Sequence, residues 1–464
     1  MTGQEFLSCL NSPRAEELLS LLYSQEGLEA ARLRYRCLIE ELLNESIFPR
    51  QEFPEADGDI RVFSVPGRTE LGGNHTDHNR GKVLAASIHL DAVALVAPRQ
   101  DMQVFFRSSG HPDIKVDISD LSLRNEEKGK TEALIRGIAA EFVAQGTPVG
   151  AFTANASNLV LPGSGLSSSA AVEVLIAKIF DNLYCAGKRS ALELAKIGQK
   201  AENVYFGKPC GLMDQTACAS GGAVAIDFKD PVNPNITNIS FNPVNFALCI
   251  VDSKGSHSDL TADYAAIPNE MKALAAFFGK TVLGELDEEM FLSSLVELRK
   301  AVGDRAILRG LHFFDENRRV DAMLAALESV NTSQPDGKTP DNIIEAFLAL
   351  VRESGDSSWE LLQNIYSNKN PHEQGLTLAL AMTKKFLRQE SGCAGACRVH
   401  GGGFAGTIQA YIPYNKLEEY RNHMEGIFGK GALTVLRIRP WGAMELNFSN
   451  KTQRRGLTDP FLRA

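Results

Sequence analysis

The segment LVLPGSGLSSSAAVEVLIAKIF, residues 159–180, carries the clearest structural signal in the chain. An apolar start breaks at Pro162, and a glycine- and serine-rich turn then leads into an uninterrupted apolar run. This pattern predicts a strand end, a turn and the first turns of a helix. Glycine lets the backbone approach a ligand, serine can cap the helix, and the free N–H groups with the helix dipole attract an anion. We therefore predict a phosphate-binding loop, with an ordinary capped helix as the alternative.

Two nucleotide-binding classes do not fit the chain. No lysine follows the glycines of this segment, which excludes a lysine-assisted P-loop ATPase. No GxGxxG motif follows an N-terminal strand with an acidic residue ~20 residues further on, which disfavours a Rossmann dehydrogenase.

The composition is that of a soluble globular protein, with 44% hydrophobic and 23% charged residues among 464. A net charge of −9 argues against a nucleic-acid partner. No apolar run has the length of a membrane span, and no secretory signal is visible. The 8 cysteines are scattered, as is typical of reduced thiols, so we expect a cytoplasmic protein. Cys393 and Cys397 are spaced for zinc, but no second pair lies nearby.

Apolar periodicity and breakers predict a mixture of helices and strands without a regular βαβ repeat, that is, an α+β fold. We expect helices at 6–10, 15–22, 30–43, 130–145, 190–206, 415–428 and over most of 262–390. Strands are expected at 60–67, 90–97, 104–106, 114–118, 221–228, 246–253, 407–413 and within 433–448. The predicted division is a helical extension over 1–47, an N-terminal domain over 48–245 and a C-terminal domain over 246–464, with the last strands packing back.

Two polar segments suggest a ligand site. Pro66–Asn79, PGRTELGGNHTDHN, is predicted to be a loop after a strand, and its dense polar groups suit a polyol or sugar. The alternative is a solvated turn. In Glu202–Ser220, Asp214 can orient a bound hydroxyl or accept its proton, and Glu202 can bind Mg²⁺. The alternatives are that Glu202 is a surface residue of its helix and that Asp214 caps the next helix.

A third segment, Arg398–Thr407, has the sequence RVHGGGFAGT. Three consecutive glycines before a strand indicate close backbone approach or a hairpin turn. We expect His400 to be structural, because an isolated histidine more often is.

In this order the motifs resemble those of the GHMP small-molecule kinases, and within them the galactokinases. The GR…HTDHN segment is similar to the galactokinase sugar signature, and PGSGLSSSAA and CGLMDQ resemble the later family motifs. Further matches are IRGIAAEF at 135–142, HSDLTADY at 257–264 and ENRRV at 316–320. The resemblance extends over residues 48–450.

The resemblance implies a two-domain GHMP kinase-like fold with the active site between the domains, and an ATP- and Mg²⁺-dependent sugar 1-kinase. Asp214 would face the C1 hydroxyl of the sugar, and Arg68 would stabilise charge on the transferring phosphoryl group and lower the pKa of that hydroxyl. The residues implied to contact the sugar are Asn74, His75, Asp77, Gly211 and Tyr264. Those implied to bind ATP are Gly163, Ser164, Gly165, Leu166, Ser167, Ser168 and Ser169, and Mg²⁺ would be held by Ser169 and Glu202.

The chain also departs from the family pattern. The usual signature has Glu at the position of Asn74, where the C6 hydroxyl is expected, Asn at that of Glu70 and Tyr at that of His78. The family usually has an arginine pair just after the position of Tyr264, where this chain has AAI at 265–267. The family also commonly has a tryptophan in the nucleotide-base region, and Thr131 stands at its position here. These departures affect the choice of sugar and the contacts to the base.

A neutral amide at position 74 tolerates a uronic acid, which a carboxylate would repel, and His78 and Arg80 add positive potential nearby. Galactose is our first expectation, with galacturonate, then another sugar or polyol, as alternatives. An alternative of another class is a non-catalytic relative that senses sugar and ATP. Arg68, Asp214 and the serine loop are all present, which favours the kinase.

Overall fold

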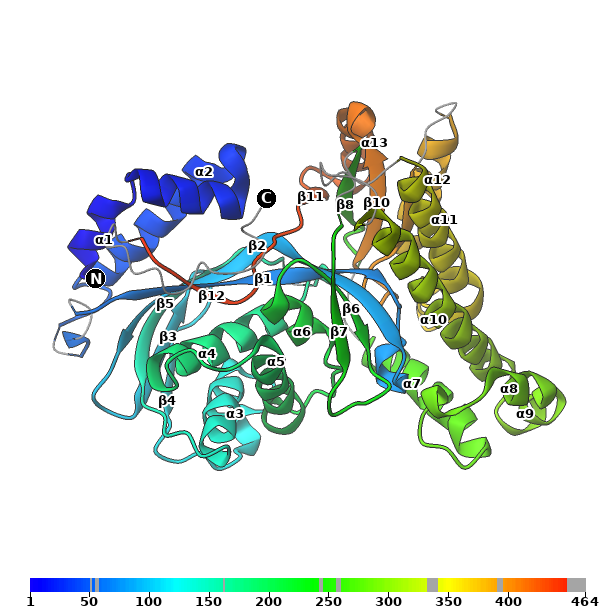
Figure 1. The fold of residues 1–464 in the computed structure, drawn as a ribbon, viewed down its shortest axis with the longest axis horizontal. Helices are drawn as coiled ribbons and strands as arrows, with labels where there is room; N and C mark the ends of the chain where they lie inside the picture. The colour runs from blue at the N-terminus through cyan, green and yellow to red at the C-terminus, as the bar shows by residue number, and fades with distance from the viewer. Residues whose placement is uncertain are drawn as a thin grey trace.

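Two sheets organise the chain (Figure 1). The computed structural model describes residues 1–50, 52–54, 58–161, 163–241, 245–255, 260–331, 341–389 and 395–448. The larger sheet has 8 strands, ordered β12-β1-β2-β5-β3-β4, with β6 beside β2 and β7 beside β6. Its strands are β1 (Arg61–Gly72), β2 (Lys82–Pro98), β3 (Gln103–Ser108), β4 (Ile114–Asp117), β5 (Phe152–Asn158), β6 (Ala223–Asp227), β7 (Asn235–Ile239) and β12 (Met444–Leu446).

The smaller sheet has 4 strands in the order β11-β8-β10-β9. They are β8 (Phe246–Asp252), β9 (Ala396–Val399), β10 (Thr407–Pro413) and β11 (Leu433–Leu436). The helices packed around this part of the chain are α7 (Thr261–Phe277), α8 (Glu288–Ser293), α9 (Leu295–Ala301), α10 (Asp304–Asn331), α11 (Asp341–Ser357), α12 (Gly375–Gln389) and α13 (Leu417–Phe428). After β11 the chain returns to the larger sheet, where β12 pairs with β1.

Helices cover both faces of the larger sheet (Figure 1). One face carries α1 (Gly3–Cys9) and α2 (Pro13–Leu43), and the other carries α3 (Thr131–Ala144), α4 (Ser168–Tyr184), α5 (Ala191–Lys200) and α6 (Met213–Ser220). In β2, Val93 and Leu95 pack toward α1 and α2, whereas Ala94 and Val96 belong to the opposite core. Burial on both faces explains why this strand is apolar without alternation.

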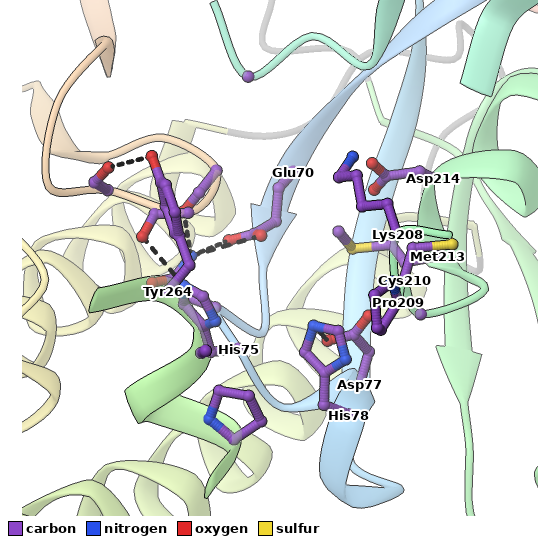
Figure 2. A pocket seen from close by; sticks show the side chains of 18 of the residues that line it. Glu70, His75, Asp77, His78, Lys208, Pro209, Cys210, Met213, Asp214 and Tyr264 are labelled. Atoms are coloured by element: carbon purple, nitrogen blue, oxygen red, sulfur yellow. Dashed lines mark hydrogen bonds and ion pairs between the residues drawn. The ribbon is translucent and has the colours of Figure 1, made fainter. Parts of the chain in front are cut away.

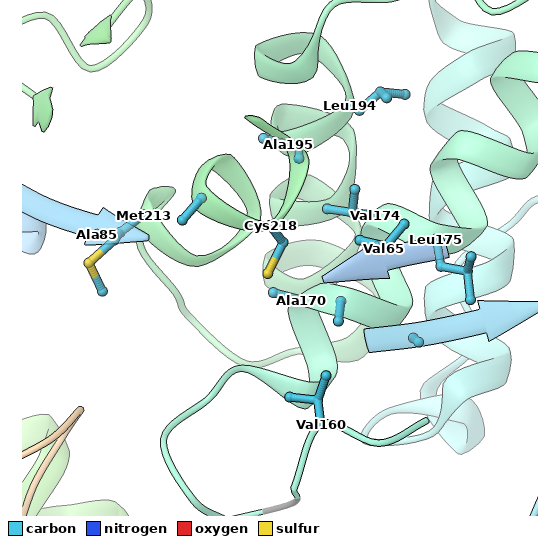
Figure 3. Packing of buried hydrophobic residues seen from close by; sticks show 14 of the residues in the cluster. Val65, Ala85, Val160, Ala170, Val174, Leu175, Leu194, Ala195, Met213 and Cys218 are labelled. Atoms are coloured by element: carbon cyan, nitrogen blue, oxygen red, sulfur yellow. The ribbon is translucent and has the colours of Figure 1, made fainter. Parts of the chain in front are cut away.

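The apolar run that follows the serines forms the buried side of α4 (Figure 3). Val174 and Leu175 are almost fully buried in the main core, next to β1 and α5 side chains such as Val65 and Leu194. Packing of this helix fixes where its first turn lies, and with it the glycine- and serine-rich turn before it.

The prediction that the first strand ends at Pro66–Gly67 is wrong, because β1 continues to Gly72. Its pairing with β2 shifts register between Pro66 and Arg68. Such a bulge accommodates a proline, which cannot donate to the ladder. Arg68 and Glu70 are therefore held on a buried strand rather than in the loop that the sequence suggested.

Several further elements differ from expectation. The helix predicted over 190–206 ends as a π-helix, Ala201–Phe206, which is a form common at functional sites. The strands β5, β7 and β9 were not predicted, and β2 begins at Lys82 rather than at residue 90. The sequence of β7, NITNI, has no apolar alternation. The α+β class is confirmed, and the domain boundaries remain a prediction.

Other expectations concern cysteines and membranes. The cysteines of the described residues are free thiols, and Cys393 of the possible zinc pair lies outside those residues. In the described part of the chain, no helix combines the length and the apolar character needed to cross a membrane.

Candidate active site

A cavity of about 820 Å³ lies between the larger sheet, α7 and the glycine-rich segment before β10. In Figure 2, Asp214 and Lys208 lie on one side of it, Tyr264 and His75 on the other, and Glu70 between them. The predicted site residues that line it are Arg68, Asn74, His75, Asp77, Gly163, Gly165, Gly211, Asp214 and Tyr264. The others, Ser164, Leu166, Ser167, Ser168, Ser169 and Glu202, are not lining residues. The serines and Leu166 lie in or just after the turn that contains Gly163 and Gly165, and Glu202 Oε1 lies 2.9 Å from Nζ of Lys208, which lines the cavity.

Arg68 and Asp214 form an ion pair at the wall of this cavity. Arg68 Nε and Nη2 lie 2.8 and 2.7 Å from Asp214 Oδ1. The other oxygen of Asp214 accepts from the Ser167 hydroxyl, and Arg68 Nη1 donates to the Gly165 carbonyl oxygen. Burial raises the pKa of Asp214, but the Arg68 charge and the hydroxyl of Ser167 outweigh burial and leave that pKa below its ordinary value. Asp214 is therefore ionised at neutral pH.

The turn before α4 leaves the first turn of that helix open. Gly163 and Gly165 have φ of +71°, and Ser167 adopts the left-handed region at +61°. Among the described residues no side chain caps the N-terminus of α4, so its first N–H groups stay available to an anion. Ser164 and Leu166 are buried, whereas Ser169 is exposed at the start of the helix.

Neighbouring backbone approaches this turn closely. The amide of Arg68 donates to the Leu166 carbonyl at 3.0 Å, and a Cβ on Gly67 would lie 2.8 Å from the same oxygen. The loop and β1 are thus in direct contact, which brings Arg68 to the loop.

His400 joins the loop to the sheet. Its Nδ1 lies 3.2 Å from the Ser164 carbonyl oxygen, and its Nε2 lies 3.0 Å from Thr69 Oγ1. Burial lowers the pKa of His400 to about 3, so the ring is neutral. These contacts agree with a structural role.

The glycine-rich segment is held from the other side of the cavity. His75 Nε2 lies 3.0 Å from the Gly402 carbonyl oxygen, and the Tyr264 hydroxyl donates to the Gly403 carbonyl at 3.0 Å. Burial lowers the pKa of His75 to about 4, so its neutral ring donates this hydrogen bond. Gly211 also lines the cavity, and it must lack a Cβ because the carboxylate of Asp77 occupies that space.

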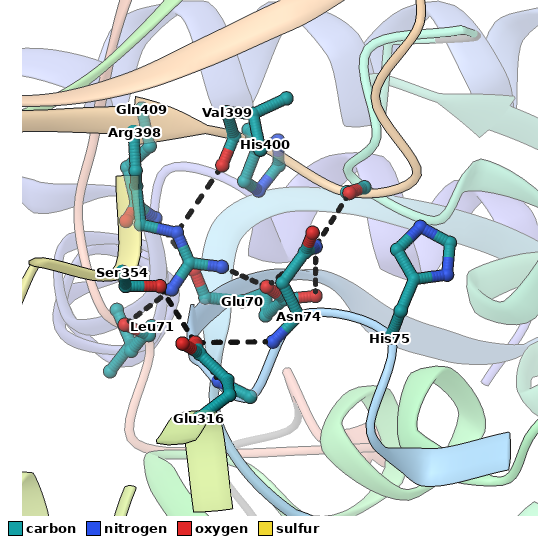
Figure 4. A network of polar contacts seen from close by, with 12 residues as sticks. Glu70, Leu71, Asn74, His75, Glu316, Ser354, Arg398, Val399, His400 and Gln409 are labelled. Atoms are coloured by element: carbon teal, nitrogen blue, oxygen red, sulfur yellow. Dashed lines mark hydrogen bonds and ion pairs between the residues drawn. The ribbon is translucent and has the colours of Figure 1, made fainter. Parts of the chain in front are cut away.

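Asn74 and Glu70 share a buried polar network (Figure 4). Asn74 Nδ2 lies 3.1 Å from Glu70 Oε1 and 2.8 Å from the Gly401 carbonyl oxygen. Its Oδ1 accepts from Asn364 Nδ2 at 2.9 Å. Arg398, which is fully buried, forms an ion pair with Glu70. Sequence reasoning missed Arg398 and Asn364, which come from distant segments.

Glu202 belongs to a second polar cluster behind Asp214. Gln215 Nε2 donates to Glu202 Oε2 at 3.0 Å and to Glu173 Oε2 at 2.9 Å, and Lys208 Nζ lies 2.9 Å from Glu202 Oε1. Glu173 and Lys208 were also missed, although Lys208 stands between the two acids of a quoted motif.

This cluster suits a cation. Within the described part of the chain, Glu173 Oε1 is buried without a hydrogen-bond partner, and the Lys208 ammonium already places a positive charge next to Glu202. No group of three or more His, Cys, Asp and Glu side chains in the described ranges could hold a metal by itself. A Mg²⁺ ion would therefore take part of its ligands from nucleotide phosphates, as it commonly does.

The chain matches two protein families. "GHMP kinases N terminal domain" matches residues 133–222, and "Galactokinase galactose-binding signature" matches residues 50–98. A galactokinase of Mannheimia succiniciproducens is 30% identical over 373 residues, which cover 78% of this chain and 88% of that protein. A galactokinase of Clostridium tetani is 28% identical over 378 residues, which cover 81% and 89% of the two chains.

Solved structures show the same fold. The structure of Lactococcus lactis galactokinase complexed with galactose matches with a TM-score of 0.69 at 22% identity, covering 87% of this chain and all (100%) of that one. Methanococcus jannaschii mevalonate kinase matches with a TM-score of 0.55 at 14% identity, covering 82% and 99%.

Proposed function

The chain belongs to the galactokinase family of the GHMP kinases, and from that premise we propose that it transfers the γ-phosphoryl group of ATP to the C1 hydroxyl of galactose. The products are galactose 1-phosphate and ADP. The observation that supports this most strongly is the linkage of Arg68, Asp214 and the Gly165–Ser167 turn into one unit at the cavity wall. A phosphate bound at the turn and a hydroxyl beside Asp214 would meet at Arg68.

Each residue of this unit has a distinct part in the transfer. The open N-terminus of α4 binds phosphate oxygens, and the Arg68 guanidinium stabilises the charge that spreads over the transferring group. Asp214 positions the sugar hydroxyl. Because its pKa is depressed, it is a weak base, and phosphoryl transfer depends mainly on positioning and charge stabilisation.

Glu202 and Ser169 are proposed to hold the Mg²⁺ ion that accompanies ATP. Bound there, the ion would neutralise charge on the phosphate oxygens. Lys208 would then release the carboxylate of Glu202, with which it pairs in this structure. His75, Asp77, Gly211 and Tyr264 are proposed to contact the sugar, together with Asn74.

The direct test is ADP release with galactose, galacturonate, arabinose, N-acetylgalactosamine and inositol, in the wild type and in Asp214→Ala. We expect turnover with galactose, and a loss of roughly a thousandfold or more in the variant. The affinity of Asp214→Ala for ADP, measured by calorimetry, should stay within threefold of the wild-type affinity. Asp113→Ala, an exposed acid paired with Arg107, is the matched control and should behave as the wild type.

Wild-type turnover by Asp214→Ala would contradict the catalytic assignment. Turnover of galacturonate but not galactose would change the substrate, and no turnover with any of the five compounds would favour the non-catalytic sensor.

A further inference from the structure

Glu70 offers the sugar a charged acceptor, whereas the protein already engages both the hydrogens and the oxygen of the Asn74 amide. Both side chains are buried and both line the cavity. The two hydrogens of the Asn74 amide are directed at Glu70 Oε1 and at the Gly401 carbonyl oxygen, and its oxygen accepts from Asn364. An amide has two N–H donors, so Asn74 has none left for a ligand.

Glu70 has spare accepting capacity. Its Oε1 accepts from both Arg398 and Asn74, whereas among the described residues Oε2 accepts one hydrogen bond, from Asn74 Nδ2 at 3.5 Å. A carboxylate has about four acceptor sites. Oε2 can therefore accept a hydrogen bond from a hydroxyl placed in the cavity.

Arg398 makes a charged acceptor tolerable at this buried place. Its guanidinium is fully buried and also donates to the Leu71 carbonyl at 3.1 Å, so its position is fixed behind β1. A buried carboxylate needs such a partner to stay ionised. Burial raises the pKa of Glu70, and the charges of Arg398 and Arg68 counter that rise. The carboxylate that the family signature places at position 74 is thus not lost here, because position 70 supplies one 3.1 Å from the Asn74 amide.

We propose that Glu70, rather than Asn74, selects the sugar, by accepting a hydrogen bond from the hydroxyl on C6 and by repelling a carboxylate at that carbon. The inference rests on the proposed sugar-kinase function and narrows its substrate to neutral hexoses. It reverses the expectation from Asn74 alone, which allowed a uronic acid.

The test compares galactose with galacturonate, which differ only at C6. Glu70→Gln removes the carboxylate that pairs with Arg398, so kcat/KM for galacturonate should rise relative to kcat/KM for galactose. Because that variant can fail to fold, the double variant Glu70→Gln/Arg398→Met removes both charges together. In each variant we expect the ratio of kcat/KM for galactose to that for galacturonate to fall roughly ten- to hundredfold. The affinity for galactose, measured by calorimetry without nucleotide, should fall too.

The matched control is Glu445→Gln/Arg61→Met, which removes another glutamate–arginine pair with one member on β1; Arg61 Nε lies 2.7 Å from Glu445 Oε1 on β12. It should leave the sugar ratio unchanged. The inference is overturned if the double variant Glu70→Gln/Arg398→Met folds and keeps both the wild-type ratio of kcat/KM values and the wild-type affinity for galactose. If the wild type releases no ADP with any sugar, the proposed kinase function fails. In that case, galactose binding that weakens when Glu70 is replaced still supports the inference about Glu70. Galactose binding that does not depend on Glu70, or the absence of galactose binding, overturns the inference.

Discussion

At the scale of single residues, Arg68 matters through its shape as well as its charge. Its three nitrogens reach two different groups, the Asp214 carboxylate and the Gly165 carbonyl. A lysine supplies one compact charge and cannot make these contacts together. Arg68 therefore couples the group that positions the sugar to the loop that binds phosphate.

We predict that Arg68→Lys lowers kcat by roughly a hundredfold or more, with smaller changes in KM for sugar and ATP. The reason is that the charge remains while its position relative to both groups changes. Steady-state ADP-release kinetics measure this. Arg61→Lys, on the same strand but paired with Glu445 outside the cavity, should retain kcat. If kcat of Arg68→Lys stays within threefold of the wild type, the simultaneous contacts of the Arg68 guanidinium with Asp214 and Gly165 are unimportant for turnover.

At the scale of elements, local sequence rules succeeded where packing agrees with them. The pattern predicts helix α4 because an uninterrupted apolar run provides most of its buried side, which also includes Glu173 and Asp181. The end of β1 was misjudged, since Pro66–Gly67 is a strong local stop signal that the pairing with β2 overrides through a bulge. Among the described strands, β7 pairs with β6 alone, and its small buried surface leaves no apolar pattern in the sequence.

The close contact between Gly211 and the turn that contains Asp77 gives a prediction at this scale. In Gly211→Ala the new Cβ would overlap the Asp77 carboxylate, so the turn that contains Asp77 must move. We expect galactose affinity to fall at least about tenfold, in line with the cost of overpacking, while ADP affinity stays within threefold. Isothermal calorimetry with each ligand checks both.

Gly426→Ala is the matched control, because Gly426 lies in α13 and nothing surrounds its Cβ position within 4 Å. It should bind both ligands normally and gain up to about 1 kcal/mol in stability. Equal galactose affinity in Gly211→Ala and Gly426→Ala would remove Gly211 from the sugar site.

At the scale of the whole molecule, the site depends on contacts that no local pattern reveals. Motif order indicated that Arg68 and Asp214 act together, yet their ion pair joins positions 146 apart, and that of Glu70 and Arg398 spans 328. The resemblance named the motif residues but not Glu173, Lys208, Arg398 or Asn364. Those residues compensate buried charge and hydrogen bonds, so only the folded arrangement shows the need for them.

The N-terminal helices are held to the larger sheet by a buried charge. Arg34 Nη1 lies 2.6 Å from Asp91 Oδ1, and Arg34 also donates to the Ser157 carbonyl at 2.7 Å. Arg34→Met should destabilise the protein by roughly 3 kcal/mol, since it leaves Asp91 with less compensation. Urea unfolding measures the change. Arg32→Met, on the same helix but paired with the exposed Glu16 and Glu29, should cost less than about 1 kcal/mol. Equal costs would refute this role for Asp91.

Buried neutral histidines make the stability of the whole molecule depend on pH. Burial and the nearby charges of Arg68 and Arg398 lower the pKa of His400 from 6.5 to about 3. Between these values the unfolded chain binds a proton that the folded chain does not. Stability therefore increases with pH across this window, by about 1.4 kcal/mol per pH unit for one such group, and levels off above about 6.5.

Urea unfolding at pH 5.0, 5.5 and 6.0 can isolate the contribution of His400. Burial raises the pKa of Glu70 and Glu173, which opposes the histidine effect, so the wild-type slope alone mixes both signs. Glu316, with a pKa lowered to about 2, contributes mainly below this range. The slope of stability against pH should be smaller in His400→Gln than in the wild type by about 1.4 kcal/mol per pH unit. His111→Gln, at an exposed turn, should keep the wild-type slope, and equal slopes in all three proteins would mean that His400 is not held neutral by the fold.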